Sequence, residues 1–128
     1  MKKDIEMTPV EGVYIAFVPN RDNWQVFVIN DRSEPLETVM VNASGDGKLE
    51  GVDKQTATLR FLLHDVPAKS YKPFEFLLPD SLKLSHRYWV SYYLGDRIFD
   101  KKFVYDPSMA DDDLMDIPVF GSPGIVLY

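Results

Sequence analysis

Cysteine is absent from the 128 residues of this chain. Its absence excludes disulfides, zinc sites built on thiolates and catalysis by a cysteine nucleophile. No apolar stretch is long enough for a helix to cross a membrane, and no apolar region follows Lys2 and Lys3 as it would in a signal peptide. We therefore predict a cytoplasmic protein that has no membrane partner.

Basic charge is scarce as well. Fourteen Lys and Arg residues stand against twenty Asp and Glu residues, which gives a formal net charge of -6. The only basic runs are the pairs Lys2-Lys3 and Lys101-Lys102. Because a negative protein repels phosphate, this balance disfavours nucleic acid as a partner.

Apolar residues, by contrast, are plentiful: 45% of the chain is hydrophobic and 13% is aromatic. Short β-rich runs follow one another, most of them closed by turn residues, and only residues 79–84 and 108–115 have room for a turn or two of helix. Seven such runs at this spacing are typical of an antiparallel all-β sandwich or barrel. The runs cover residues 10–18, 24–30, 36–43, 56–63, 71–78, 87–94 and 97–105.

The last two runs predict a hairpin, because only Gly95-Asp96 separates them. In that register Tyr92 faces Phe99 and Tyr88 faces Phe103, and these rings belong to the core face. The opposite face is more apolar than a solvated sheet requires. It carries Trp89, Ser91, Tyr93, Ile98, Asp100 and Lys102.

The first two runs are also apolar on both faces. Residues 13–18 place Val13, Ile15 and Phe17 on one side, with Tyr14, Ala16 and Val18 on the other. Residues 24–29 repeat this pattern. A sandwich strand normally alternates apolar residues inside with polar residues outside. Strands that are apolar on both faces need a second cover.

Two segments resemble bacterial immunoglobulin-like sandwich modules. In the first, the strand of residues 26–29 ends in Asn30-Asp31, and the segment Pro35-Leu36-Glu37-Thr38-Val39 returns. In the second, residues 66–70 form a turn before the next strand. The whole chain is similar to short bacterial proteins of unknown function. The resemblance implies an immunoglobulin-like, Greek-key antiparallel sandwich of about seven strands, and it implies no activity.

This interpretation divides the chain into three parts: an N-terminal arm (1–9), the sandwich (10–106), and an acidic linker with an apolar C-terminal tail (107–128). The tail ends in Ile125-Val126-Leu127-Tyr128, and we expect these apolar residues to be buried. Three alternatives remain open. The tail covers its own domain, crosses to a second copy, or adds a strand to a different protein.

Candidate catalytic residues are few. His64-Asp65 with Ser70 lacks the setting of a nucleophile, so a hydrolase is the weakest hypothesis, and we expect His86 to lie at the surface. The segment 44–48 lacks the spacing of a phosphate-binding loop and predicts an ordinary turn. Residues 111–113 and Asp116 predict a solvated acidic linker. We expect no metal, no cofactor and no enzymatic activity.

The pattern favours a non-enzymatic protein-interaction or scaffold module whose partner is itself, as a homodimer, or another protein. The contact with the partner would be made by the apolar sheet face opposite the core and by the C-terminal tail. The alternative is a sandwich that binds a carbohydrate or small ligand on surface aromatic residues. The candidate interaction residues are Trp89, Tyr93, Ile98, Ile117, Val119, Phe120, Ile125 and Leu127.

Overall fold

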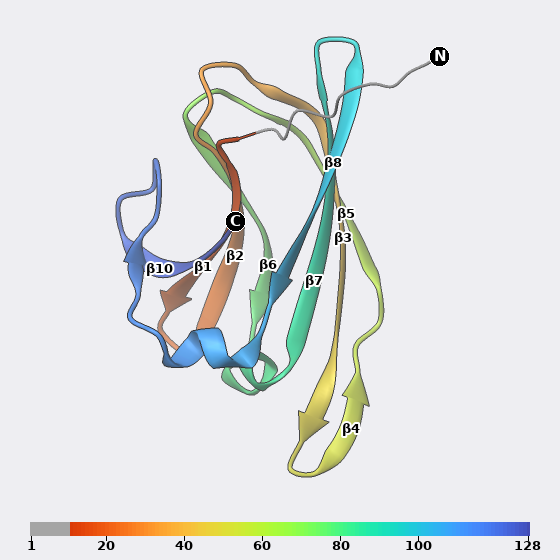
Figure 1. The fold of residues 1–128 in the computed structure, drawn as a ribbon, viewed down its shortest axis with the longest axis vertical. Helices are drawn as coiled ribbons and strands as arrows, with labels where there is room; N and C mark the ends of the chain where they lie inside the picture. The colour runs from red at the N-terminus through yellow and green to blue at the C-terminus, as the bar shows by residue number, and fades with distance from the viewer. Residues whose placement is uncertain (1–10) are drawn as a thin grey trace.

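The structure is a computed structural model that describes residues 11–128. These residues form two antiparallel sheets that pack face to face, with two short 3-10 helices beside them (Figure 1). The predicted all-β sandwich is thereby confirmed, with ten strands in the described residues where about seven were predicted. The predicted N-terminal arm, residues 1–9, lies outside the described residues.

The first sheet has the strand order β6-β2-β1-β10-β9. Its centre is the hairpin of β1 and β2, whose pairing runs from Val13 opposite Asn30 to Asn20 opposite Asn23. The C-terminal strand β10 pairs with the other side of β1, so residues far apart in sequence lie side by side. The strands are β1 (Val13–Asn20), β2 (Asn23–Asn30), β6 (Ser70–Leu77), β9 (Met115–Asp116) and β10 (Pro123–Leu127).

The second sheet has the order β4-β3-β7-β8, and β5 also pairs with the long strand β3. The chain passes between the sheets after β2, β5, β6 and β8. The 3-10 helix η1 (Pro79–Lys83) connects β6 to β7, and η2 (Pro107–Asp111) follows β8. The strands of this sheet are β3 (Leu36–Leu49), β4 (Val52–Gln55), β5 (Leu59–Val66), β7 (Ser85–Leu94) and β8 (Arg97–Tyr105).

The predicted hairpin of β7 and β8 is confirmed. Tyr92 pairs with Phe99 and Tyr88 pairs with Phe103, as the two-residue turn required. Gly95 adopts a φ of 65°, which a glycine tolerates without the steric cost of a side chain. The turn therefore sets which residues of both strands face the core.

The predicted turn at residues 44–48 is wrong, because these residues continue β3. Asp46 pairs with Ser85 of β7 on one side and with Gln55 of β4 on the other. Glycine and aspartate favour turns when the backbone has no partner. Here β4 and β7 pair with the backbone of these residues on both sides, and this pairing overrides the local preference.

The main core lies between the sheets. Val13, Ile15 and Phe17 of β1 point into it, and the aromatic side chains of β7 and β8 meet them from the second sheet. The ring of Phe17 lies 4.9 Å from that of Tyr105. For β7 and β8 this arrangement matches the inner face predicted from the alternation of residues, whereas for β1 the alternation left the choice between its two apolar faces open.

The tail covers the other apolar face of the first sheet. Ile125 and Leu127 enter the main core beside β1, whereas Ile117 packs on the outer side against Phe27 and Ile29. The ring of Phe120 lies 5.0 Å from the ring of Phe27. Of the three alternatives for the tail, the structure has the one in which the tail covers its own domain.

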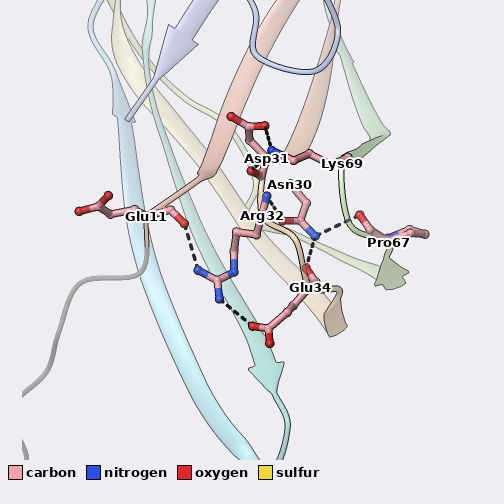
Figure 2. Close-up of polar contacts among 7 residues, drawn as sticks. All are labelled: Glu11, Asn30, Asp31, Arg32, Glu34, Pro67 and Lys69. Atoms are coloured by element: carbon pink, nitrogen blue, oxygen red, sulfur yellow. Dashed lines mark hydrogen bonds and ion pairs between the residues drawn. The ribbon is translucent and has the colours of Figure 1, made fainter.

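A buried asparagine joins three segments at one end of the sandwich, as Figure 2 shows. The Asn30 amide nitrogen donates to the carbonyl oxygens of Glu34, Val66 and Pro67 at 2.9–3.1 Å. Its side-chain oxygen accepts a hydrogen bond from the backbone N–H of Arg32 at 3.0 Å. The end of β2, the start of β3 and the turn between β5 and β6 are thus held together by one side chain.

Candidate functional site

The outer face of the second sheet exposes large apolar side chains. We call this surface the open face and define it by six residues on β3, β5, β7 and β8. Their exposed fractions run from 37% for Tyr93 to 60% for Ile98, and Trp89 is 48% exposed. The other three residues are Met40, Leu62 and Val104.

Strand register makes five of these residues neighbours. Met40 lies opposite Leu62 on one side and opposite Ser91 on the other. Trp89 and Tyr93 flank Ser91 on the same face of β7, and Tyr93 pairs with Ile98. Cross-strand and diagonal neighbours in a sheet are close enough for long side chains to touch. The open face therefore carries apolar side chains that are cross-strand or diagonal neighbours, with Ser91 among them, and neighbouring exposed apolar side chains mark an interaction site more often than single ones do.

Charged groups of both signs lie among these apolar side chains. The Lys102 ammonium lies 5.6 Å from the centre of the Trp89 ring. Arg60 donates a hydrogen bond to Asn42 at 3.1 Å, and Asp100 lies opposite Ser91. The face therefore offers both cations and anions beside its apolar side chains.

The structure brings together only three of the eight predicted interaction residues. Trp89, Tyr93 and Ile98 share the open face, whereas the five tail residues lie on or beside the first sheet. Of these five, Ile117, Ile125 and Leu127 are buried in the chain's own sandwich, Phe120 is half-buried, and Val119 is exposed in the turn after Ile117.

Sequence reasoning did not find the contribution of Met40 and Leu62 to the open face. Residues 59–63 read Leu-Arg-Phe-Leu-Leu, so an apolar alternation cannot show which side faces out. The register shift between Val39 and Met40 decides this orientation. Bulges of this kind depend on the partner strand and leave little trace in local sequence.

Two edge strands, β8 and β6, are poorly suited to pairing with a further strand. Lys101 on β8 points to the inner face, and Pro73 on β6 lacks an N–H donor. The Lys72 ammonium crosses between the sheets and donates to the carbonyl oxygens of Leu63 and Asp65, at 2.7 and 2.6 Å. Inward lysines and prolines disfavour edge pairing. Contacts along these two edges are therefore disfavoured.

His86 is buried, so its predicted surface position is wrong. It pairs with Gly45, and a side chain at position 45 would meet the His86 ring at 2.7 Å. The missing side chain leaves room for the imidazole to turn inward. Its Nε2 then donates to the Ser81 carbonyl oxygen at 2.7 Å.

A half-buried carboxylate lies in the same region. Glu75 of β6 points between the sheets, where its Oε2 accepts a hydrogen bond from the Tyr88 hydroxyl at 3.0 Å. Burial raises the pKa of Glu75, and the Tyr88 hydrogen bond offsets part of this rise. Burial likewise lowers the pKa of His86, against the opposing effects of the Ser81 carbonyl and of Asp46.

The depressed pKa of His86 makes folding stability depend on pH. The unfolded histidine titrates near 6.5 and the folded one lower, so the unfolded chain takes up the proton first as the pH falls. The contribution of His86 is complete above pH 6.5 and declines as the pH falls through 6.5 toward the folded pKa. In urea unfolding, the stability deficit of His86→Gln should therefore shrink between pH 7.5 and pH 5.5.

The matched control for that experiment is His64→Gln. His64 is exposed, and no hydrogen bond to its ring is present among the described residues. Its substitution should change the free energy of unfolding by less than about 0.5 kcal/mol, as is usual at the surface. A His86→Gln deficit that stays constant over the same pH range would contradict the assignment.

The remaining candidate residues, His64 and the acidic group of residues 111–113 with Asp116, are exposed. His64 faces solvent at a position where β5 bulges against β3. Residues 111–113 and Asp116 are exposed, in agreement with a solvated acidic segment. No group of three His, Cys, Asp or Glu side chains in this range is placed to hold a metal ion.

None of the helices in the described part of the chain is long and apolar enough to cross a membrane. Comparison with known proteins finds no protein-family model and no curated protein that matches the chain.

Proposed function

We propose that this protein is a non-enzymatic interaction module that self-associates through the open face. The observation that carries the proposal is a difference between the two sheets. Residues 117–126 cover the apolar outer face of the first sheet, whereas nothing in the described chain covers Trp89, Tyr93 and Ile98 on the second. Covering that apolar surface with a partner would remove it from water and stabilise the assembly.

A second copy of the chain is the partner that this surface favours. Most soluble assemblies are symmetric homo-oligomers, in which one patch meets the same patch on its partner. The open face suits such a contact because it carries Lys102 and Arg60 together with Asp100. Two copies related by a two-fold axis can place these opposite charges against each other beside the apolar side chains.

The proposed contact excludes the tail. Ile117, Ile125 and Leu127 are already buried against the chain's own strands, so little of their apolar surface remains for a partner. We also propose a cytoplasmic location, which the absence of cysteine supports. We further propose an immunoglobulin-like family origin, which the hydrogen bonds of Asn30 between the end of β2 and the turn after β5 support.

The test is the oligomeric state as a function of protein concentration. Sedimentation of the full chain should show a dimer at tens of micromolar. The double variant Trp89→Ser with Ile98→Ser should remain a monomer, because loss of a central tryptophan typically costs an interface about 2 kcal/mol or more, roughly a thirtyfold weaker association.

The matched control is Leu78→Ser, which removes a side chain that is 67% exposed and lies outside the open face. It should dimerise like the wild type. A wild-type chain that remains monomeric up to the millimolar range would contradict self-association. Near-ultraviolet circular dichroism would establish that every variant has kept its fold.

Carbohydrate binding on the same face is a second candidate, which the exposure of Trp89 and Tyr93 on a flat sheet supports. One observation weighs against it. The Lys102 ammonium already lies over the Trp89 ring, where a sugar would have to stack. Titration of tryptophan fluorescence with a panel of glycans separates the two functions, because Trp24 is half-buried in the sandwich and Trp89 is exposed.

A further inference from the structure

A small cavity opens at the end of the sandwich where the second sheet divides. The pairing of β3 with β5 ends at Ala43 opposite Leu59, and its pairing with β4 starts at Asp46 opposite Gln55. The intervening residue Thr56 is bound to Gly45 by two hydrogen bonds of 2.7 and 2.8 Å. This division leaves a cavity of about 170 Å³.

Several hydrogen-bond acceptors line this cavity. Its lining includes Glu75, His86 and the hydroxyl-bearing residues Thr56 and Ser81. Because Nε2 of His86 donates to a carbonyl oxygen, the neutral ring keeps Nδ1 as a hydrogen-bond acceptor. The cavity is therefore rich in acceptors, and the hydroxyl groups can act in either direction.

No cation of the described chain neutralises the carboxylate. Among residues 11–128, no Lys or Arg side chain forms an ion pair with Glu75, and Tyr88 supplies its only side-chain hydrogen bond. A half-buried carboxylate that has lost part of its water without gaining a cation attracts a cation that can reach it. Its neighbours Leu77 and Leu59 add apolar walls.

We propose that this cavity binds a small organic cation, a primary ammonium group on a short alkyl chain. Glu75 is the counter-ion, the His86 Nδ1 and the hydroxyl groups accept the remaining ammonium hydrogens, and Leu59 and Leu77 contact the alkyl chain. The cavity is smaller than the sites that hold drug-sized ligands, which occupy roughly 300–1,000 Å³. This function is separate from association through the open face, which lies on the outside of the second sheet.

The test uses n-butylammonium chloride as the probe and the full chain as the receptor. Titration followed by amide chemical shifts should give saturable changes at Gly45, Thr56 and His86, with a roughly millimolar Kd, as suits so small a ligand. The neutral analogue n-butanol should bind at least tenfold more weakly, because it cannot neutralise the carboxylate.

Glu75→Gln should weaken n-butylammonium binding at least tenfold while the protein stays folded, because glutamine is isosteric and can accept the Tyr88 hydrogen bond. Glu37→Gln, which removes a carboxylate away from the cavity, should bind like the wild type. Ala57→Trp, at the exposed entrance, should also abolish binding and leaves the buried groups unchanged. Equal affinity for n-butanol, unchanged binding by Glu75→Gln, or shifts confined to surface carboxylates would overturn the proposal.

Discussion

Deletion of residues 117–128 is expected to abolish the cooperative unfolding transition of this protein. The deletion removes β10 from its place beside β1 and exposes the outer face of the first sheet. Burial of Ile117, Ile125 and Leu127 contributes roughly 1.5–3 kcal/mol for each side chain. Because a whole domain is stable by only about 5–15 kcal/mol, this loss is comparable with the total.

Single substitutions in the tail should cause smaller losses of folding stability than the deletion. Ile117→Ala should lower the free energy of unfolding by about 2–5 kcal/mol, as is usual for a fully buried isoleucine. Gly124→Ala should destabilise the same contact, because the added Cβ would lie 2.5 Å from the Phe17 carbonyl oxygen and 2.6 Å from Cδ1 of Ile117. Urea denaturation followed by circular dichroism measures each variant.

Val119→Ala is the control for the tail, since Val119 is exposed in the turn that follows Ile117. It should change stability by less than about 1 kcal/mol. A truncated chain that unfolds with the same midpoint and slope as the full chain would show that the sandwich does not depend on its tail.

Asn30→Ala is expected to have the largest effect of any single polar substitution. Asn30 is fully buried, and its side chain makes four hydrogen bonds to the backbone of three segments. Alanine leaves these backbone groups without their partner, and each one that stays buried costs about 1–3 kcal/mol. We expect a loss of roughly 3–5 kcal/mol in the free energy of unfolding.

The control lies in the same corner (Figure 2). Lys69 forms an exposed ion pair with Asp31 at 2.9 Å, and Lys69→Ala should cost less than about 1 kcal/mol. Comparison of the two variants separates the buried hydrogen bonds from the surface charges. Equal losses for both variants would contradict the central role of Asn30.

Local patterns in the sequence were sufficient for the hairpin of β7 and β8. Two residues between two β-rich runs leave few turn geometries, and the turn sets the register of both strands. The same alternation placed Trp89, Tyr93 and Ile98 together on one face before any contact was known. These features depend on residues that are close in sequence, so a single sequence contains the information for them.

Long-range pairing decided the features that were predicted wrongly. Residues 44–47 contain two glycines and an aspartate, and they form a strand only because β4 and β7 are present on both sides. His86 is buried only because Gly45 lies opposite it. Neither partner can be identified from the local sequence, since the two residues are 41 positions apart.

Residues 13–18 and 24–29 are apolar on both sides of their strands. The sequence therefore determined that both faces of the first sheet had to be covered, because one opposing sheet can cover only one of them. Only the tertiary structure decided what covers each outer face. Ile117 and Phe120 return to the first sheet because β10 pairs with β1, a contact across about a hundred residues. Trp89 and its neighbours on the second sheet are left open, because the chain has no further apolar segment among its described residues to place over them.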